Sequence, residues 1–161
     1  MRWVIMTCTA LAVLVADQIT KYLVVASMPV NSAHPLAPFF SLVHVRNKGA
    51  AFGFMNDPDI VWQKYFFLGV TAAALGFMVV LAKNTRPQEK MVFWALGLIS
   101  GGAIGNAIDR LMYGEVVDFL DFYLGNWHWP AFNIADIAIC VGAGLMVLSI
   151  FFQPQKTGGG K

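Results

Sequence analysis

Two aspartates in this sequence have no cation close to them along the chain. Asp118 lies in a loop between two apolar stretches, and Asp136 begins a stretch that is otherwise uncharged. Two carboxylates at a partly buried site cannot both ionise easily, so one keeps a proton while the other stays a base. Such a pair can activate water for attack on a peptide carbonyl and protonate the leaving group. Spacing along the sequence alone does not select this pair. Asp121 could take the place of Asp118, and Asp109 could take the place of either member.

The composition indicates that these acids lie in a membrane protein. Hydrophobic residues make up 58% of the chain and charged residues 12%, whereas about a quarter of the residues of a soluble domain are charged. Four apolar stretches each have about the length that a transmembrane helix needs, roughly 17 to 25 residues. They lie at about 3–25, 61–82, 91–112 and 134–152. We therefore expect an all-α membrane protein, a four-helix transmembrane bundle forming one domain over residues 1–152, with 153–161 as a disordered cytoplasmic tail.

The first stretch is too long for a cleaved signal peptide, and three more follow it, so we expect an uncleaved helix there. Four spans place both termini on one side of the membrane and the two long loops on the other. Six of the eleven Lys and Arg residues lie on the side of the termini and five on the other side. Two of these five, Lys21 and Arg110, fall within helix ends as candidate functional charges, so the charge bias favours cytoplasmic termini.

The first outer loop, residues 26–60, has features of its own. Residues 39–45 alternate imperfectly between apolar and polar, and the turn signal Asn47-Lys48-Gly49 follows, which predicts a small extracytoplasmic β-sheet in this loop. Phe52 and Phe54, on either side of Gly53, could form a platform or flap over a substrate. Simple packing or contact with lipid explains them equally well. Aromatic residues at the span ends, expected as interface anchors, are Trp62, Trp127, Trp129 and Phe132.

Polar residues of the spans gather at one end of the predicted bundle, because odd-numbered spans end and even-numbered spans begin on the same face. A charge in a lipid-facing helix costs about 2.5 to 3.5 kcal/mol at its centre, so these groups must pair or take part in chemistry. For Asp17 with Lys21, four residues apart, local ion pairing is an equally good interpretation. The same holds for Asp109 with Arg110. This layer comprises Asp17, Lys21, Asn106, Asp109, Arg110, Asn133 and Asp136 from the spans, with Asn47 and Asp118 from the loops.

Glycines recur every four residues in the third span, at Gly97, Gly101 and Gly105. Small residues at this spacing form a smooth ridge on which another helix can pack closely. We expect this ridge to have a structural role. Close packing there would hold Asn106 and Arg110, one turn apart, against a neighbouring helix.

Five motifs follow one another along the chain: Asp17-Gln-Ile-Thr-Lys21, Arg46-Asn47-Lys-Gly-Ala-Ala-Phe52, Gly101-Gly-Ala-Ile-Gly-Asn106-Ala-Ile-Asp109-Arg110, Val117-Asp118-Phe119 and Phe132-Asn133-Ile-Ala-Asp136. In this order they resemble the motifs of type II lipoprotein signal peptidase. The resemblance covers essentially the whole chain, including its length and four-span layout. Lys48 is a departure, since a small polar residue is expected there, but it bears on no catalytic role.

The resemblance implies a multi-pass protease of the bacterial inner membrane, with its active site near the outer face. Such an enzyme removes the signal peptide of prolipoproteins, cutting just before a cysteine that already carries diacylglycerol, and globomycin inhibits it. The catalytic pair would be Asp118 and Asp136. The residues that would line the site, position the substrate and hold the pair are Asp17, Asn47, Asn106, Arg110 and Asn133.

No cofactor, metal or nucleic acid is expected. The three histidines occupy separate loop positions without the spacing of metal ligands, and we expect their side chains to be exposed; they are His34, His44 and His128. The net charge is only +2, and the Lys and Arg residues are scattered along the chain. We expect a monomer in contact with membrane lipid. A small transporter or proton channel is the alternative, because intramembrane acids also form proton relays. The confinement of the polar groups to one end argues against it, and a purely structural subunit would leave the acids unexplained.

Overall fold

The computed structural model describes residues 1–49 and 62–151. Within these residues four helices are long and apolar enough to cross a membrane, and their ends differ from the predicted spans by at most two residues. The proposed platform at Phe52 to Phe54 and the predicted tail at 153–161 lie outside the described residues. The helices are α1 (Arg2–Ser27), α2 (Trp62–Asn84), α3 (Lys90–Tyr113) and α4 (Ile134–Phe151).

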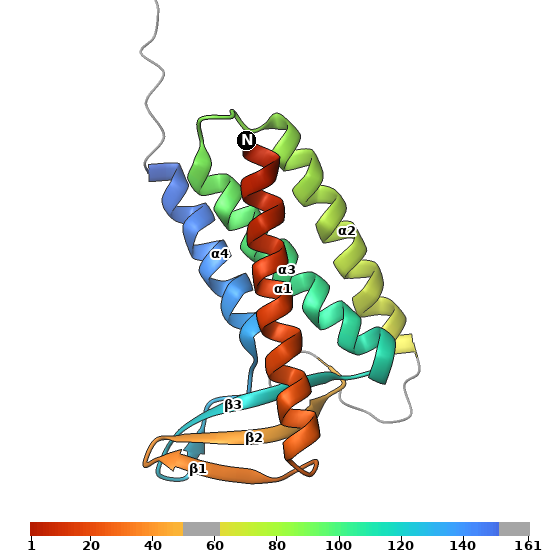
Figure 1. The fold of residues 1–161 in the computed structure, drawn as a ribbon, viewed down its shortest axis with the longest axis vertical. Coiled ribbons are helices and arrows are strands. Elements are labelled where there is room, and N and C mark those ends of the chain that lie inside the picture. Colours follow the sequence, from red (N-terminus) through yellow and green to blue (C-terminus); the bar gives the residue numbers. More distant parts are fainter. Residues whose placement is uncertain (50–61, 152–161) are drawn as a thin grey trace, which may run out of the picture.

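Helix α3 is the centre of the bundle and packs against the other three helices (Figure 1). The glycine ridge explains how α1 can approach it closely. A Cβ atom on Gly97 would lie 2.6 Å from the Thr9 Cβ atom, and one on Gly101 would lie 2.6 Å from the Ala10 carbonyl oxygen. These distances leave no room for a side chain, so the glycines set the separation of the two helices.

A four-stranded antiparallel sheet lies at the end of the bundle where α1 and α3 end and α4 begins (Figure 1). Its strands, in spatial order, are β1 (Ala33–Ala37), β2 (Phe40–Asn47), β3 (Val116–Leu124) and β4 (Trp127–His128). The sequence prediction placed the sheet in the first outer loop, but half of its strands come from the second. β3 pairs with β2, and one face of β3 packs against the end of α1: Val117 and Phe119 lie in one cluster with Val24 and with Met28, the residue just after the helix.

A tight turn connects α3 to β3. Gly114 ends the helix with a left-handed φ of 79°, and its N–H donates to the Arg110 carbonyl oxygen at 3.0 Å. Glycine adopts this conformation without the steric penalty of a side chain. The turn brings the start of β3 back under α3, so that the Asp109 carboxylate accepts a hydrogen bond from the Val117 N–H at 3.0 Å. Asp118, the next residue, is thereby placed under the helix bundle.

Candidate active site

Asp118 is almost fully buried, at 3% exposed, in β3. Its two carboxylate oxygens accept hydrogen bonds from two amide side chains. Asn47, at the end of the paired strand β2, donates to Oδ2 at 3.0 Å, and Asn133 donates to Oδ1 at 2.7 Å. Strand pairing sets this arrangement, because Val45 lies opposite Asp118 and brings the end of β2 close to the carboxylate.

Asp136 lies in the first turn of α4, and Asn133 is the residue just before that helix. The Asn133 side-chain oxygen accepts from the Asp136 N–H at 3.0 Å, and the Asp136 Oδ2 atom accepts from the Asn133 N–H at 3.1 Å. This reciprocal arrangement is a capping box built from Asn and Asp. Asn106 of α3 donates to the other oxygen, Oδ1, at 2.9 Å. Both oxygens of Asp136 are thus held by donors.

Asp118 and Asp136 lie on the wall of one cavity of about 620 Å³. Asn47, Asn106 and Arg110 form polar parts of the same wall. Its apolar parts come from the loop before α4 and from one face of that helix, and include Trp129, Phe132, Ile137 and Val141. The cavity therefore combines two carboxylates and amide donors with an apolar surface.

The other two predicted site residues, Asp17 and Asn133, are fully buried and lie behind the cavity wall. Asp17 of α1 accepts a hydrogen bond from the Ala135 N–H at 2.9 Å, which satisfies a free donor at the start of α4. Asn133 contacts both Asp118 and Asp136 as described above. The structure therefore brings all seven predicted residues together, but these two hold the carboxylates and their helix in place and do not face the cavity.

Burial raises the pKa of Asp118 to about 7. The hydrogen bonds from Asn47 and Asn133 and the charge of Lys21 lower that pKa, while the nearby charge of Asp136 raises it. Desolvation of the carboxylate is the largest effect, so a protonated Asp118 persists near neutral pH. Asp136 lies in the first turn of α4, close to the free backbone N–H groups at the start of that helix.

Arg110 places a positive charge on the cavity wall. Its guanidinium lies over the ring of Phe67 from α2, with 4.6 Å between the guanidinium carbon and the ring centroid. The Nη1 atom donates to the Asn106 carbonyl oxygen at 3.4 Å, and the buried Nε atom has no hydrogen-bond partner within the described part of the chain. This positive charge lies on the same wall as Asp118 and Asp136.

The two rival acids have other partners. Asp109 is bound by Lys21 at 2.9 Å, and Asp121 accepts from the His128 ring nitrogen at 2.9 Å. Neither residue lines the cavity. Among the histidines, His34 and His128 are exposed as expected, but the expectation was wrong for His44. Its side chain is 2% exposed because its ring bonds the Met28 carbonyl oxygen and Arg46.

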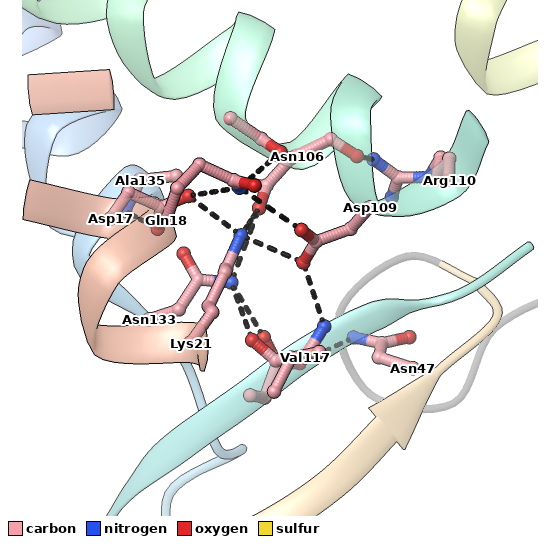
Figure 2. A network of polar contacts seen from close by, with 12 residues as sticks. Asp17, Gln18, Lys21, Asn47, Asn106, Asp109, Arg110, Val117, Asn133 and Ala135 are labelled. Atoms are coloured by element: carbon pink, nitrogen blue, oxygen red, sulfur yellow. Dashed lines mark hydrogen bonds and ion pairs between the residues drawn. The ribbon is translucent and has the colours of Figure 1, made fainter. Parts of the chain in front are cut away.

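Three further residues of the site were not predicted from the sequence as site residues. They are Gln18, Lys21 and Asp109. Figure 2 shows these three side chains converging between α1, α3 and the start of β3. The Gln18 amide donates to Asp109 Oδ1 at 3.1 Å and to the Gly105 carbonyl oxygen at 3.2 Å. The signal that could have found Lys21 is its place four residues after Asp17 inside an apolar span, where an unpaired charge is unfavourable.

Comparisons with known proteins show which proteins this chain is similar to. A model of the signal peptidase (SPase) II family matches residues 9–152. Lipoprotein signal peptidase of Nitratidesulfovibrio vulgaris is 48% identical over 153 residues, or 94% of this chain and 92% of that protein. Lipoprotein signal peptidase of Maridesulfovibrio salexigens is 52% identical over 139 residues, or 86% of this chain and 89% of that protein. A solved structure described as a bacterial membrane enzyme superposes with a TM-score of 0.83 at 29% identity, covering 97% of this chain and 93% of that one.

Proposed function

This chain belongs to the signal peptidase II family, and we propose that it is an aspartic endopeptidase acting on diacylglyceryl-modified prolipoproteins. It cleaves the signal peptide just before the lipidated cysteine, with Asp118 and Asp136 as the catalytic pair. The observation that carries the proposal is that both carboxylates lie on the wall of one cavity, each oriented by amide donors. A multi-pass membrane enzyme with this pair can reach a peptide bond whose cysteine is anchored in lipid.

In the proposed reaction Asp118 begins protonated and Asp136 begins as the carboxylate. Asp136 removes a proton from a water molecule as its oxygen attacks the peptide carbonyl carbon, while Asp118 donates its proton to the carbonyl oxygen. The tetrahedral intermediate then collapses: the hydroxyl proton returns to Asp118, and the leaving amine takes the proton held by Asp136. Arg110, on the same wall, binds a backbone carbonyl oxygen of the peptide and so helps to position the scissile bond.

The apolar side of the cavity supports a lipid-modified substrate. Ile137 and Val141 of α4 line the cavity and are 39% and 49% exposed, so their face is open to the surroundings of the bundle. We place diacylglyceryl chains along this face. The enzyme would lie in the bacterial inner membrane with cytoplasmic termini and its site near the outer face, where translocated substrates arrive.

The burial pattern favours this reading over a transporter or proton channel. Within residues 1–49 and 62–151, the buried charged side chains lie in the sheet or in the helical turns next to it. A cluster at the other end of the bundle consists of apolar residues such as Met6, Val92 and Phe93. A conduction path needs polar groups through the full depth of the bilayer.

The test uses the purified full chain in detergent and two synthetic peptides of the same sequence, one with a diacylglyceryl cysteine and one with free cysteine. Mass spectrometry should find cleavage immediately before the modified cysteine and little cleavage of the unmodified peptide. Globomycin should inhibit the reaction. Cleavage elsewhere, or none of the lipidated peptide, would overturn the proposal.

A further inference from the structure

Lys21 is 2% exposed although it carries a charge within a transmembrane helix. Its ammonium group has three N–H donors. Three oxygens lie within hydrogen-bonding distance of the nitrogen (Figure 2). They are Oδ2 of Asp17 at 2.9 Å, Oδ2 of Asp109 at 2.9 Å and Oδ1 of Asn106 at 2.8 Å. One acceptor for each donor fixes the position of the ammonium group.

The contact with Asn106 decides how its amide group is oriented. An amide has an acceptor oxygen on one side and a donor nitrogen on the other. Because Asn106 Oδ1 accepts from Lys21, and also from Asn133 at 3.2 Å, its nitrogen must point the opposite way, toward Asp136 Oδ1 at 2.9 Å. A flipped amide would place its NH₂ group against the ammonium and its oxygen against the Asp136 carboxylate, which is unfavourable at both ends.

We propose that Lys21 is a positioning residue for catalysis, which holds the Asn106 amide in the orientation that donates a hydrogen bond to Asp136. The inference rests on the proposed function, since that assigns Asp136 to the reaction. A purely structural ion pair between Lys21 and its two carboxylates would explain the contacts with Asp17 and Asp109. It would give no role to the third contact, with Asn106.

The carboxylate partners extend the same arrangement to both members of the pair. Asp17 accepts from the N–H of Ala135, the residue before Asp136. Asp109 accepts from the N–H of Val117, the residue before Asp118. The oxygens that bind the ammonium therefore belong to side chains that hold the backbone beside each catalytic carboxylate.

A double-mutant cycle tests whether Lys21 acts through Asn106. The four proteins are the wild type, Lys21→Met, Asn106→Ala and the double variant, and kcat and KM are measured for the lipidated peptide. Misplacing a catalytic group by about 1 Å can lower turnover about 100-fold, so we expect a kcat loss of that order in each single variant, with KM within about threefold of wild type. The double variant should lose clearly less than the product of the two single losses, because both changes disturb the same hydrogen bond to Asp136.

Lys64→Met is the matched control. Lys64 also lies near the sheet end of the bundle, where its ammonium donates to the Leu111 carbonyl oxygen at 3.0 Å in an exposed hydrogen bond, and it contacts neither carboxylate of the pair. Its kcat and KM should both stay within about twofold of wild type, as is usual for substitutions away from buried polar networks.

Three results would overturn the inference: near wild-type kcat in Lys21→Met, a KM change without a kcat change, or losses that multiply in the double variant. If Lys21→Met does not fold, a variant that carries both Lys21→Met and Asp109→Asn takes its place in the cycle. These two substitutions together leave the formal charge of the cluster unchanged. Failure of this variant to fold as well would mark Lys21 as structural and also overturn the inference. If wild type cleaves no lipidated peptide, the proposed function fails, and the inference fails with it.

Discussion

Asn133 and Asp136 cap the same helix reciprocally, each accepting a hydrogen bond from the backbone N–H of the other at 3.0 and 3.1 Å. The Asn133 amide nitrogen donates at the same time to Asp118 at 2.7 Å. Asn133, the residue that caps α4, therefore also sets the position of the two carboxylates relative to each other. Helix capping and the geometry of the proposed catalytic pair are one structural feature in this protein.

Substitutions at Asn133 should separate these two roles. Serine can still cap the helix but cannot reach Asp118 with an amide donor, so Asn133→Ser should keep the cap while kcat falls at least about tenfold. Asn133→Ala loses both contacts and should be destabilised further, by about 1 kcal/mol for the cap alone. Thermal unfolding in detergent and peptide cleavage, measured on the same samples, distinguish the variants. Full turnover by Asn133→Ser would show that the contact with Asp118 is dispensable.

The pH dependence should report Asp118. Since burial raises its pKa to about 7, the alkaline limb of the kcat/KM profile should lie near that value, where the proton that Asp118 donates is lost. Asn47 donates to the carboxylate and so lowers this pKa. Asn47→Leu removes the donor, the pKa rises further, and the alkaline limb should move to higher pH. A shift to lower pH would contradict the assignment of Asp118 as the acid.

Glycine substitutions should show how tightly α1 and α3 pack beside the site. A Cβ atom on Gly105 would lie 2.5 Å from Asp17 Oδ2, so Gly105→Ala must displace the carboxylate that binds Lys21 and the start of α4. We expect destabilisation of about 1 to 3 kcal/mol, as for overpacking of a core. Gly144→Ala in α4 is the matched control, because nothing lies within 4 Å of its added carbon. Its unfolding temperature should be unchanged or higher, and equal effects of the two changes would contradict this packing.

Asp121 should prove dispensable for the chemistry. It pairs with His128 on the sheet and does not line the cavity. Asp121→Asn keeps a similar shape and can still bond the ring, so kcat and KM should stay within about twofold of wild type. Loss of turnover in folded Asp121→Asn protein would restore it as a candidate for the pair.

The sequence was enough to predict the helices, because each span is an apolar segment of membrane length and needs little information from the rest of the chain. It was also enough to predict that Asp17, Asn106 and Asp136 would lie at the same end, since this follows from alternating helix direction. The pairing of β2 with β3 could not be predicted in this way. It depends on a register between segments about 70 residues apart, and on the cover that α1 provides.

The division of the site into cavity wall and supporting groups was also beyond the sequence. Asp17 and Asn133 have the same kinds of polar atoms as the residues that line the cavity, and only the packing of α4 against α1 and α3 turns them inward. The contact between Lys21 and Asn106 also depends on the tertiary structure. Spacing along α1 indicates the pair with Asp17, but the bond to Asn106 requires α3 to lie alongside.

The most direct test of the central claim is cleavage of the lipidated peptide by Asp118→Asn and Asp136→Asn, compared with wild type at equal amounts of folded protein. Each change keeps the size of the side chain but removes a carboxylate, so each should lower kcat at least about 1,000-fold while peptide binding persists. Near wild-type turnover by either folded variant would contradict the assignment of that residue to the catalytic pair.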